Sequence, residues 1–202
     1  MGDIFQLFIQ GVQQTSWLEW VSVLAGVIQV FLSKENKVLT YPFGIISILT
    51  AVAVLYPAKL YAEMILQGYY LVMSVYGWWF WTNKQNEPRP ITYANRRDWK
   101  IVLLIILLGF FLLHTVLQRW TDSDVPIWDA WVSCTAWAGM WLLAKRKIEN
   151  WILLNISNLF AVPLFIYKEL YLFALLTAVL FTVAVFGYLK WTRIVKIQRK
   201  EL

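Results

Sequence analysis

The chain has very little of the chemistry that enzyme and metal sites need. It holds one cysteine, Cys134, and one histidine, His114, and only 15% of its residues are charged. A single cysteine excludes an intrachain disulfide and a thiolate cluster, and a single histidine argues against a zinc or haem site. No nucleophile stands beside a base within an apolar run. We therefore expect no catalytic residue, no metal and no cofactor, and hence not an enzyme.

Hydrophobic runs take up most of the sequence. Residues of hydrophobic type make up 60% of the chain, the mean hydropathy is +0.57, and there are 13 Trp. Runs of about 20 apolar residues separated by short polar breaks are typical of membrane-spanning helices. The sequence predicts an all-α polytopic membrane protein with seven transmembrane helices, at residues 17–32, 38–56, 59–81, 99–118, 126–144, 149–167 and 170–191.

The two ends of the chain are expected to lie outside the spans. Residues 1–16 lack a basic start and a small-residue cleavage site, and their pattern of apolar residues and glutamines fits an amphipathic helix on the membrane surface. Residues 193–202 are predicted to form a basic cytoplasmic tail.

Basic residues are distributed unevenly between the polar breaks. Fifteen of the 18 Lys and Arg residues follow spans one, three, five and seven, and the opposite side holds only Lys59, Arg119 and Lys168. Because basic residues stay preferentially in cytoplasmic loops, we expect the N-terminus outside and the C-terminus in the cytoplasm. The net charge of +6 then reflects topology and contacts with the lipid bilayer, so no nucleic-acid partner is needed.

The sequence contains an internal repeat. Trp17-Leu-Glu-Trp-Val-Ser recurs at Trp128 with a shift of 111 residues, and Val75-Tyr-Gly-Trp-Trp-Phe-Trp-Thr recurs at Val185 with a shift of 110. Two three-helix repeats, 17–82 and 126–192, therefore flank residues 83–125, which supply a cytoplasmic loop and one linker helix. Because the linker crosses the membrane once, the repeats are parallel. This 3+1+3 plan is that of the SWEET sugar transporters.

Polar and aromatic residues that differ between the repeats are the better candidates for a binding site, because a small ligand is seldom symmetric. In the sequence alignment Trp137 corresponds to Gly26 and Trp141 to Val30. Helical spacing places these mismatched residues on stripes of spans three, five and six, near the middle of the membrane or in its cytoplasmic half. The candidate substrate-binding residues are Trp137, Trp141, Trp151, Asn155, Asn158, Gln67, Tyr70 and Ser74.

The stretch Glu-Asn-Trp-Ile-Leu-Leu-Asn-Ile-Ser-Asn at 149–158 is the most polar part of any span. We expect Glu149 and Asn150 at the cytoplasmic edge, where water reaches them, and Asn155 and Asn158 deeper, where the amides need a partner. Amides also join membrane helices to one another, which is the structural alternative to a substrate contact. Glu63 is the only carboxylate placed well inside a span, so no proton- or sodium-coupling group is evident.

The order Trp137-x-x-x-Trp141 followed by Asn150-Trp151-x-x-x-Asn155, set in a SWEET-like duplication, resembles the bacterial PnuC nicotinamide riboside transporters. The resemblance implies a vitamin B3 transporter of the inner membrane that works by facilitated diffusion. It also implies functional coupling to a cytoplasmic nicotinamide riboside kinase that traps the substrate for NAD synthesis. The alternative cargo on the same fold is another vitamin such as thiamine or riboflavin, another nucleoside, or a sugar. The residues leave homo-oligomer formation open.

Overall fold

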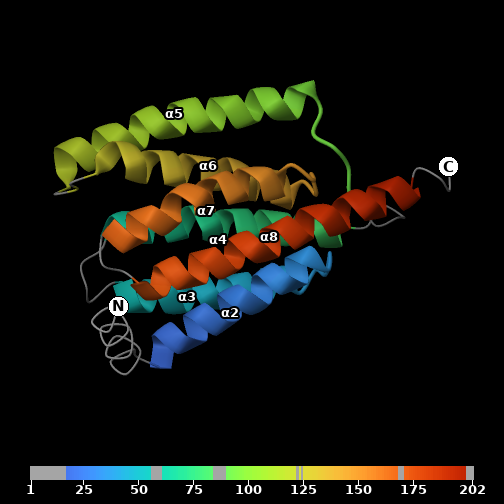
Figure 1. Cartoon of the computed structure of the whole chain (residues 1–202), viewed down its shortest axis with the longest axis horizontal. Coiled ribbons are helices and arrows are strands. Elements are labelled where there is room, and N and C mark those ends of the chain that lie inside the picture. The colour runs from blue at the N-terminus through green and yellow to red at the C-terminus, as the bar shows by residue number, and fades with distance from the viewer. Residues whose placement is uncertain are drawn as a thin grey trace.

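The computed structural model describes residues 17–55, 61–83, 90–121, 123, 125–167 and 171–198. Within these residues the chain forms seven α-helices and no β-sheet, as the sequence predicts (Figure 1). In chain order the helices are α2 (Trp17–Lys34), α3 (Thr40–Leu55), α4 (Tyr61–Thr82), α5 (Arg96–Trp120), α6 (Pro126–Ala144), α7 (Asn150–Tyr167) and α8 (Tyr171–Gln198). The predicted surface segment 1–16 lies outside the described residues.

Most helix ends agree with the predicted spans to within three residues, but α8 continues seven residues further, to Gln198. Residues 193–198, expected to be part of the tail, are therefore helical. The Lys and Arg residues make this stretch too polar for the membrane interior. They do not end the helix, because both residue types are good helix formers in water. Conversely, α5 starts early at Arg96, because Asn95 and Asp98 form a capping box in which each side chain accepts the other's backbone N–H.

Several helices satisfy the membrane criterion on their own. Among the described residues, Arg96–Trp120, Asn150–Tyr167 and Ala174–Gln198 are long and apolar enough to cross a membrane, and Trp20–Lys34 and Thr40–Ala53 are shorter apolar helices. Between residues 101 and 112 the exposed side chains of α5 are large and apolar, including Leu108 and Phe111 at 61% and 66% exposure. An apolar surface of this kind suits lipid rather than water.

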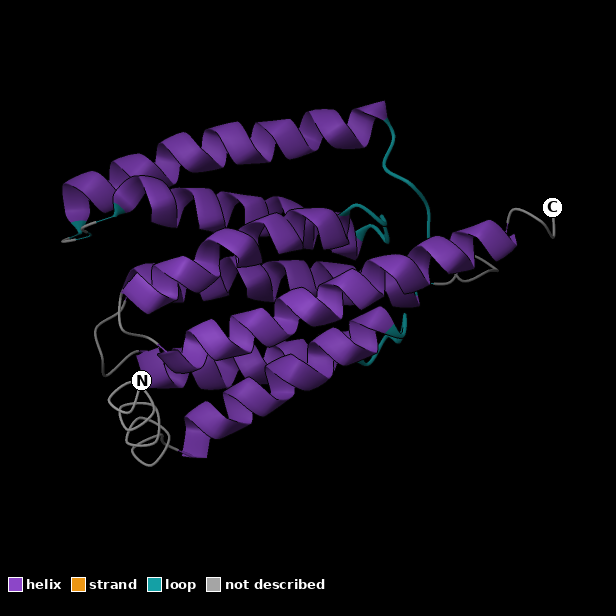
Figure 2. Ribbon diagram, viewed as in Figure 1, coloured by secondary structure: helices purple, strands orange, loops and turns teal. Residues whose placement is uncertain are grey.

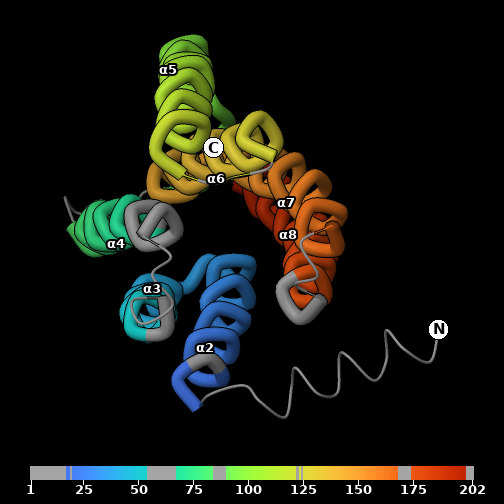
Figure 3. The backbone as a smooth tube through the Cα atoms, turned by 90° about the vertical axis from the view of Figure 1, so that its left-hand side faces the viewer, coloured from blue at the N-terminus to red at the C-terminus, as the bar shows by residue number. Residues whose placement is uncertain are grey.

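Six helices form a ring, and α5 lies outside it. Seen end-on, the ring runs α2, α3, α4, α6, α7, α8 and back to α2, with α5 packed mainly on α6 (Figure 3). Each repeat supplies three consecutive members, so the repeats meet at two seams, α2 with α8 and α4 with α6. These two seams are equivalent when one repeat is superposed on the other, as expected for parallel repeats.

One end of the ring carries the turns that precede α3 and α7, the start of α5 and the end of α8, and its loops gather on the right of Figure 2. We call it the basic end. Its described cations are Lys34, Lys37, Arg96, Arg97, Lys100, Lys145, Arg146, Lys147, Lys190, Arg193 and Lys196. Arg119 is the described cation near the opposite end.

The α2–α3 and α6–α7 turns share one backbone conformation. Asn36 and Arg146 both have positive φ, 57° and 55°, in the left-handed region. Six backbone hydrogen bonds of the α2–α3 turn recur in the α6–α7 turn at a shift of 110 residues, and the Ile152 N–H adds one that Pro42 cannot make. At this end Trp141 is therefore equivalent to Phe31, and its sequence alignment with Val30 is wrong by one residue.

Residues 91–94 of the linker cover the α6–α7 turn. Thr92 accepts a hydrogen bond from Ile148 N–H and donates its own N–H to the Arg146 carbonyl, both at 3.1 Å. The Glu149 carboxylate accepts the Ala94 N–H at 2.8 Å. The linker is therefore bonded to the turn of the second repeat through both backbone and side-chain groups.

The structure corrects one expectation at this turn. Asn150, predicted to face water, is fully buried, and its amide donates to the Lys147 carbonyl. The equivalent Thr40 of the first repeat is also buried, at 1% exposure. Counting residues from the helix end places Asn150 at the end of the span, but it cannot show how the surrounding segments pack there.

Candidate functional site

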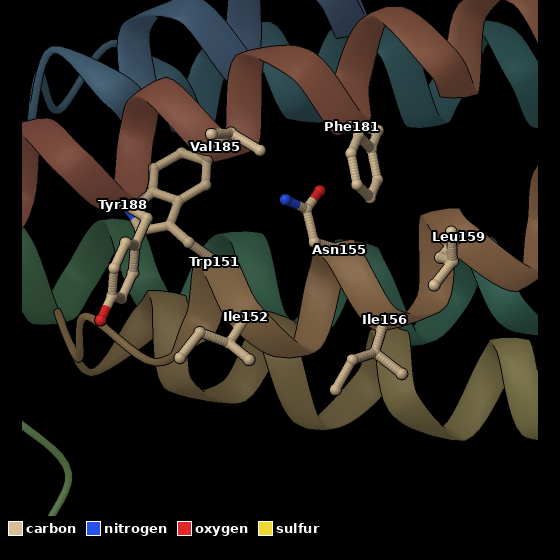
Figure 4. A pocket seen from close by; sticks show the side chains of 8 residues that line it. All are labelled: Trp151, Ile152, Asn155, Ile156, Leu159, Phe181, Val185 and Tyr188. Carbon is tan, nitrogen blue, oxygen red and sulfur yellow. The ribbon is translucent and has the colours of Figure 1, made fainter.

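A pocket opens between α7 and α8, with a volume of about 280 Å³. Figure 4 shows Asn155 pointing from α7 toward α8, in the region between Phe181 and Val185. All lining side chains are uncharged: Trp151, Ile152, Asn155, Ile156, Leu159, Phe181, Val185 and Tyr188. The pocket is therefore an apolar hollow with one amide in its wall, which is the usual composition of a small-molecule site.

Asn155 supplies the amide group of this pocket. Its Oδ1 is buried and accepts no hydrogen bond from any described residue. An unsatisfied buried acceptor costs roughly 1–3 kcal/mol, and a hydrogen bond from a bound ligand is one way to offset that cost. The i, i+4 spacing from Trp151 places the amide one helical turn away from an indole, as the sequence predicts.

Trp151 closes the pocket toward the basic end. Its side chain is 2% exposed and meets the Trp191 ring edge-on, with ring centroids 5.6 Å apart. A Cβ on Gly187 would lie only 2.8 Å from the indole, so the close approach of α7 to α8 requires glycine there. The position of Trp151 is thus fixed by its neighbours on α8.

Trp137 lies at a second place, where α4, α5 and α6 meet. Tyr69 of α4 donates to its backbone carbonyl at 2.9 Å, and the two rings are 5.1 Å apart. On the α5 side, a Cβ on Gly109 would lie 3.3 Å from the Trp137 ring. The indole Nε1 is buried and has no hydrogen-bond partner among the described residues. Like Asn155, Trp137 therefore offers a buried polar atom that is free to bond a ligand.

Tyr69 is a residue that the sequence reasoning missed. The three-to-four spacing on α4 favoured Tyr70, whose ring lies 6.1 Å from the Tyr69 ring. Tyr69 is the one that crosses the seam to α6. A usable signal was present, because the repeat places Val179 at the position equivalent to Tyr69.

The remaining predicted residues are dispersed. Trp141 packs in a cluster of α5, α6 and α7 with Val102, Leu142 and Leu153, away from the cluster that holds Trp151. Ser74 of α4 is fully buried, and its hydroxyl has no partner among the described residues. The other three are half-buried, on α4 or α7: Gln67, Tyr70 and Asn158.

The described residues also show no metal chemistry. No group of three or more His, Cys, Asp or Glu side chains comes together among them. Cys134 is fully buried, and its thiol lies 3.3 Å from the Trp131 carbonyl. The polar groups that the described interior offers a ligand are amide, indole and hydroxyl groups.

Seven helices in two parallel triple-helix repeats, with unsatisfied polar atoms buried among them, define a multi-pass membrane transporter of the 3+1+3 class. Residues 16–193 match the model of the nicotinamide mononucleotide transporter family, and the chain belongs to that family.

Curated relatives agree with the family assignment. The nicotinamide riboside transporter PnuC of Escherichia coli is 25% identical over 203 residues, covering 87% of this chain and 85% of the relative. The PnuC protein of Neisseria mucosa is 29% identical over 195 residues, covering 90% and 74%. That of Haemophilus influenzae is 25% identical over 187 residues, covering 90% and 81%.

A solved structure shows the same fold. The crystal structure of the vitamin B3 transporter PnuC superposes with a TM-score of 0.74 at 23% identity, over 96% of this chain and 88% of the other. The predicted fold of seven helices in a 3+1+3 duplication is thereby confirmed.

Proposed function

We propose that this protein carries nicotinamide riboside across the bacterial inner membrane by facilitated diffusion. The family and the names of the relatives support transport of this compound class. The observation that carries the proposal is the buried Asn155 Oδ1 without a protein partner among the described residues, in an otherwise apolar pocket. The carboxamide N–H groups or ribose hydroxyls of the substrate are donors of the kind that this oxygen requires.

The aromatic residues suit the ring of the substrate. Nicotinamide riboside is a flat pyridinium, and a cation of that shape is attracted to the face of an indole. Trp151 stands beside Asn155 in the pocket, and Trp137 offers a second indole with an unsatisfied N–H. The two lie on different helices of the second repeat, so the substrate path runs along that repeat and the seam with α4.

The riboside fits the pocket better than the mononucleotide that gives the family its name. A phosphate group would bring about two negative charges at neutral pH, which require Arg or Lys partners in a desolvated site. None of the eight lining residues is basic. The neutral lining accepts a ribose hydroxyl and disfavours a phosphate.

The basic end is proposed to face the cytoplasm. Eleven of the described cations lie there, and basic residues concentrate on the cytoplasmic side of membrane proteins. This orientation places the N-terminus outside and the C-terminus inside. Substrate released at the basic end then meets a cytoplasmic kinase, whose phosphoryl transfer adds a charge that the neutral pocket does not accept, so transport becomes directional.

Alternating access would be a rocking of the two repeats about their seams, driven by the substrate gradient. Because the linker is bonded to the α6–α7 turn and α5 packs on α6, the moving body on that side comprises α5 to α8. The other body is α2 to α4.

Binding measurements on the purified full chain test the substrate. We expect quenching of Trp fluorescence by nicotinamide riboside and none by thiamine, riboflavin or a sugar at equal concentration. Asn155→Leu and Trp137→Leu should each weaken binding at least tenfold, which corresponds to about 1.4 kcal/mol. Trp120→Leu, at an indole that is 80% exposed, is the matched control and should bind normally. Preference for thiamine, or unchanged binding by both variants, would contradict the proposal.

A further inference from the structure

Each seam at the basic end is closed by one tryptophan. Trp191 of α8 donates its indole N–H to the Ser33 carbonyl of α2 at 3.2 Å. Trp81 of α4 donates to the Ala144 carbonyl near the end of α6, also at 3.2 Å. The two donors are equivalent positions of the repeats, at a shift of 110 residues, and each bonds a carbonyl of the opposite repeat. The hydrogen bonds are therefore reciprocal.

The two indoles also contact each other in the centre of this end. Their ring centroids lie 6.1 Å apart, and both side chains are buried, at 6% and 0% exposure. A second aromatic ring from the same repeat meets each one edge-on, Tyr41 against Trp81 at 5.2 Å and Trp151 against Trp191 at 5.6 Å. These rings come from both repeats and form the larger apolar cluster of the protein's basic end.

A cation makes a second contact across each seam. At the α2–α8 seam, Lys190 forms an ion pair with Glu35. At the equivalent positions of the α4–α6 seam, Lys145 lies over the Phe80 ring, 4.8 Å from its centroid. The seams thus use the same two positions with different chemistry, an exposed ion pair on one side and a cation–π contact on the other.

The physical consequence concerns separation of the repeats. An indole N–H in apolar surroundings needs an acceptor, and here the acceptor belongs to the other rigid body. If the repeats separate at this end, both indole N–H donors and both carbonyl acceptors must form hydrogen bonds with water instead. Such an exchange has a modest net free energy, so the contacts favour one state without locking it.

We infer that Trp81 and Trp191 are gate residues for transport, and that their reciprocal hydrogen bonds hold the basic end of the path closed. The inference rests on the proposed transport function but not on the identity of the substrate. Lys190 and Glu35 act as a salt-sensitive latch on the α2–α8 seam. Trp151 belongs both to this aromatic cluster and to the pocket. A ligand beside Asn155 would therefore contact a residue that packs against the gate residue Trp191.

The gate is tested by measuring the separation of the repeats. Two exposed residues of opposite repeats, Leu39 and Ile197, are replaced by cysteine for spin labels in a Cys134→Ala background. Pulsed electron–electron double resonance on the full chain in lipid nanodiscs then gives the distribution of label distances. We expect Trp81→Phe with Trp191→Phe to raise the long-distance population about fivefold or more for each hydrogen bond lost. Phenylalanine keeps one aromatic ring at each position and removes the indole N–H together with the second ring.

The matched control replaces two other indoles. Trp99→Phe with Trp120→Phe changes exposed residues of α5, which lies outside the ring, and should leave the distances unchanged. An unchanged distribution in the Trp81/Trp191 variant overturns the inference. So does an equal change in the α5 control.

A charge exchange provides a second measurement if the Trp variant does not fold. Lys190→Glu and Glu35→Lys should each lengthen the distances, and the two together should restore them. Single variants without effect, or a double variant that is not restored, overturn the inference. Because label distances need no substrate, a failure of the wild type to take up nicotinamide riboside would instead refute the proposed substrate and leave this result standing.

Discussion

Tyr69 of α4 donates its hydroxyl to the backbone carbonyl of Trp137 on α6, with oxygen atoms 2.9 Å apart and ring centroids 5.1 Å apart. The pair crosses the seam between the repeats. It therefore holds the indole against the opposite repeat and makes the environment of Trp137 depend on how the repeats are placed.

Removing that hydroxyl should lower stability and weaken substrate binding. Tyr69→Phe keeps the ring contact and removes one hydrogen bond, which should cost about 0.5–1.5 kcal/mol in free energy of unfolding. Affinity should fall as well, because Trp137 is then held less firmly. A fluorescence titration with nicotinamide riboside measures it. Tyr167→Phe, at a 61% exposed position of α7, is the control and should bind as the wild type does. Equal affinity for both variants would show that Tyr69 does not position Trp137.

Asn155→Leu should change stability and binding in opposite directions. The substitution removes a buried acceptor that no described residue bonds, so the empty protein gains about 1 kcal/mol or more in free energy of unfolding. Binding of nicotinamide riboside should fall at least tenfold. Thermal unfolding in detergent and a binding titration give the two values. Loss of stability together with binding would identify Asn155 as a contact between helices.

The close approach of α7 to α8 predicts a strong effect at Gly187. A Cβ there would lie 2.8 Å from the Trp151 ring, and forcing the helices apart should cost about 1–3 kcal/mol in Gly187→Ala. Gly68 on α4 provides the matched control, because a Cβ there meets no atom within 4 Å. Gly68→Ala should instead be neutral or stabilising by up to about 1 kcal/mol, since alanine favours a helix. Thermal unfolding curves of the two variants decide the point.

The latch between Lys190 and Glu35 should be insensitive to pH in the neutral range. The hydrogen bond to Lys190 lowers the pKa of the Glu35 carboxyl from its ordinary value. A carboxyl with a depressed pKa contributes its stabilisation above the ordinary value, about 4.3, and loses it as the pH falls through the lower folded value. Label distances across the α2–α8 seam should therefore be constant from pH 8 to pH 6.

Ionic strength, unlike pH in the neutral range, should change the label distances across the α2–α8 seam. Because the ion pair is exposed, raising the ionic strength screens it and should increase the long-distance population. Glu35→Gln removes the charge and should abolish this salt response. A salt response that persists in Glu35→Gln would assign it to other charges of the basic end.

Much of the fold is readable from the sequence because the membrane imposes simple rules. Apolar runs of fixed length must become helices, since backbone groups in lipid have no other partner. The Val-aromatic-Gly motif at Val75 and again at Val185 identifies the duplication from residue types alone. The same rules predict the Trp151 and Asn155 stripe, because residues four apart share one face of a helix.

Residue order thus specifies the helices, their number, the parallel repeats and the residues that break the symmetry, whereas packing settles which faces meet. Packing buries Asn150 at the α6–α7 turn, places Trp141 in the α5–α6–α7 cluster, brings Tyr69 to Trp137, and joins Trp81 and Trp191 across the seams. Helical periodicity fixes a side chain's direction around its own axis. The rotation and neighbour of each helix follow from contacts between segments distant in the chain, which local sequence patterns do not encode.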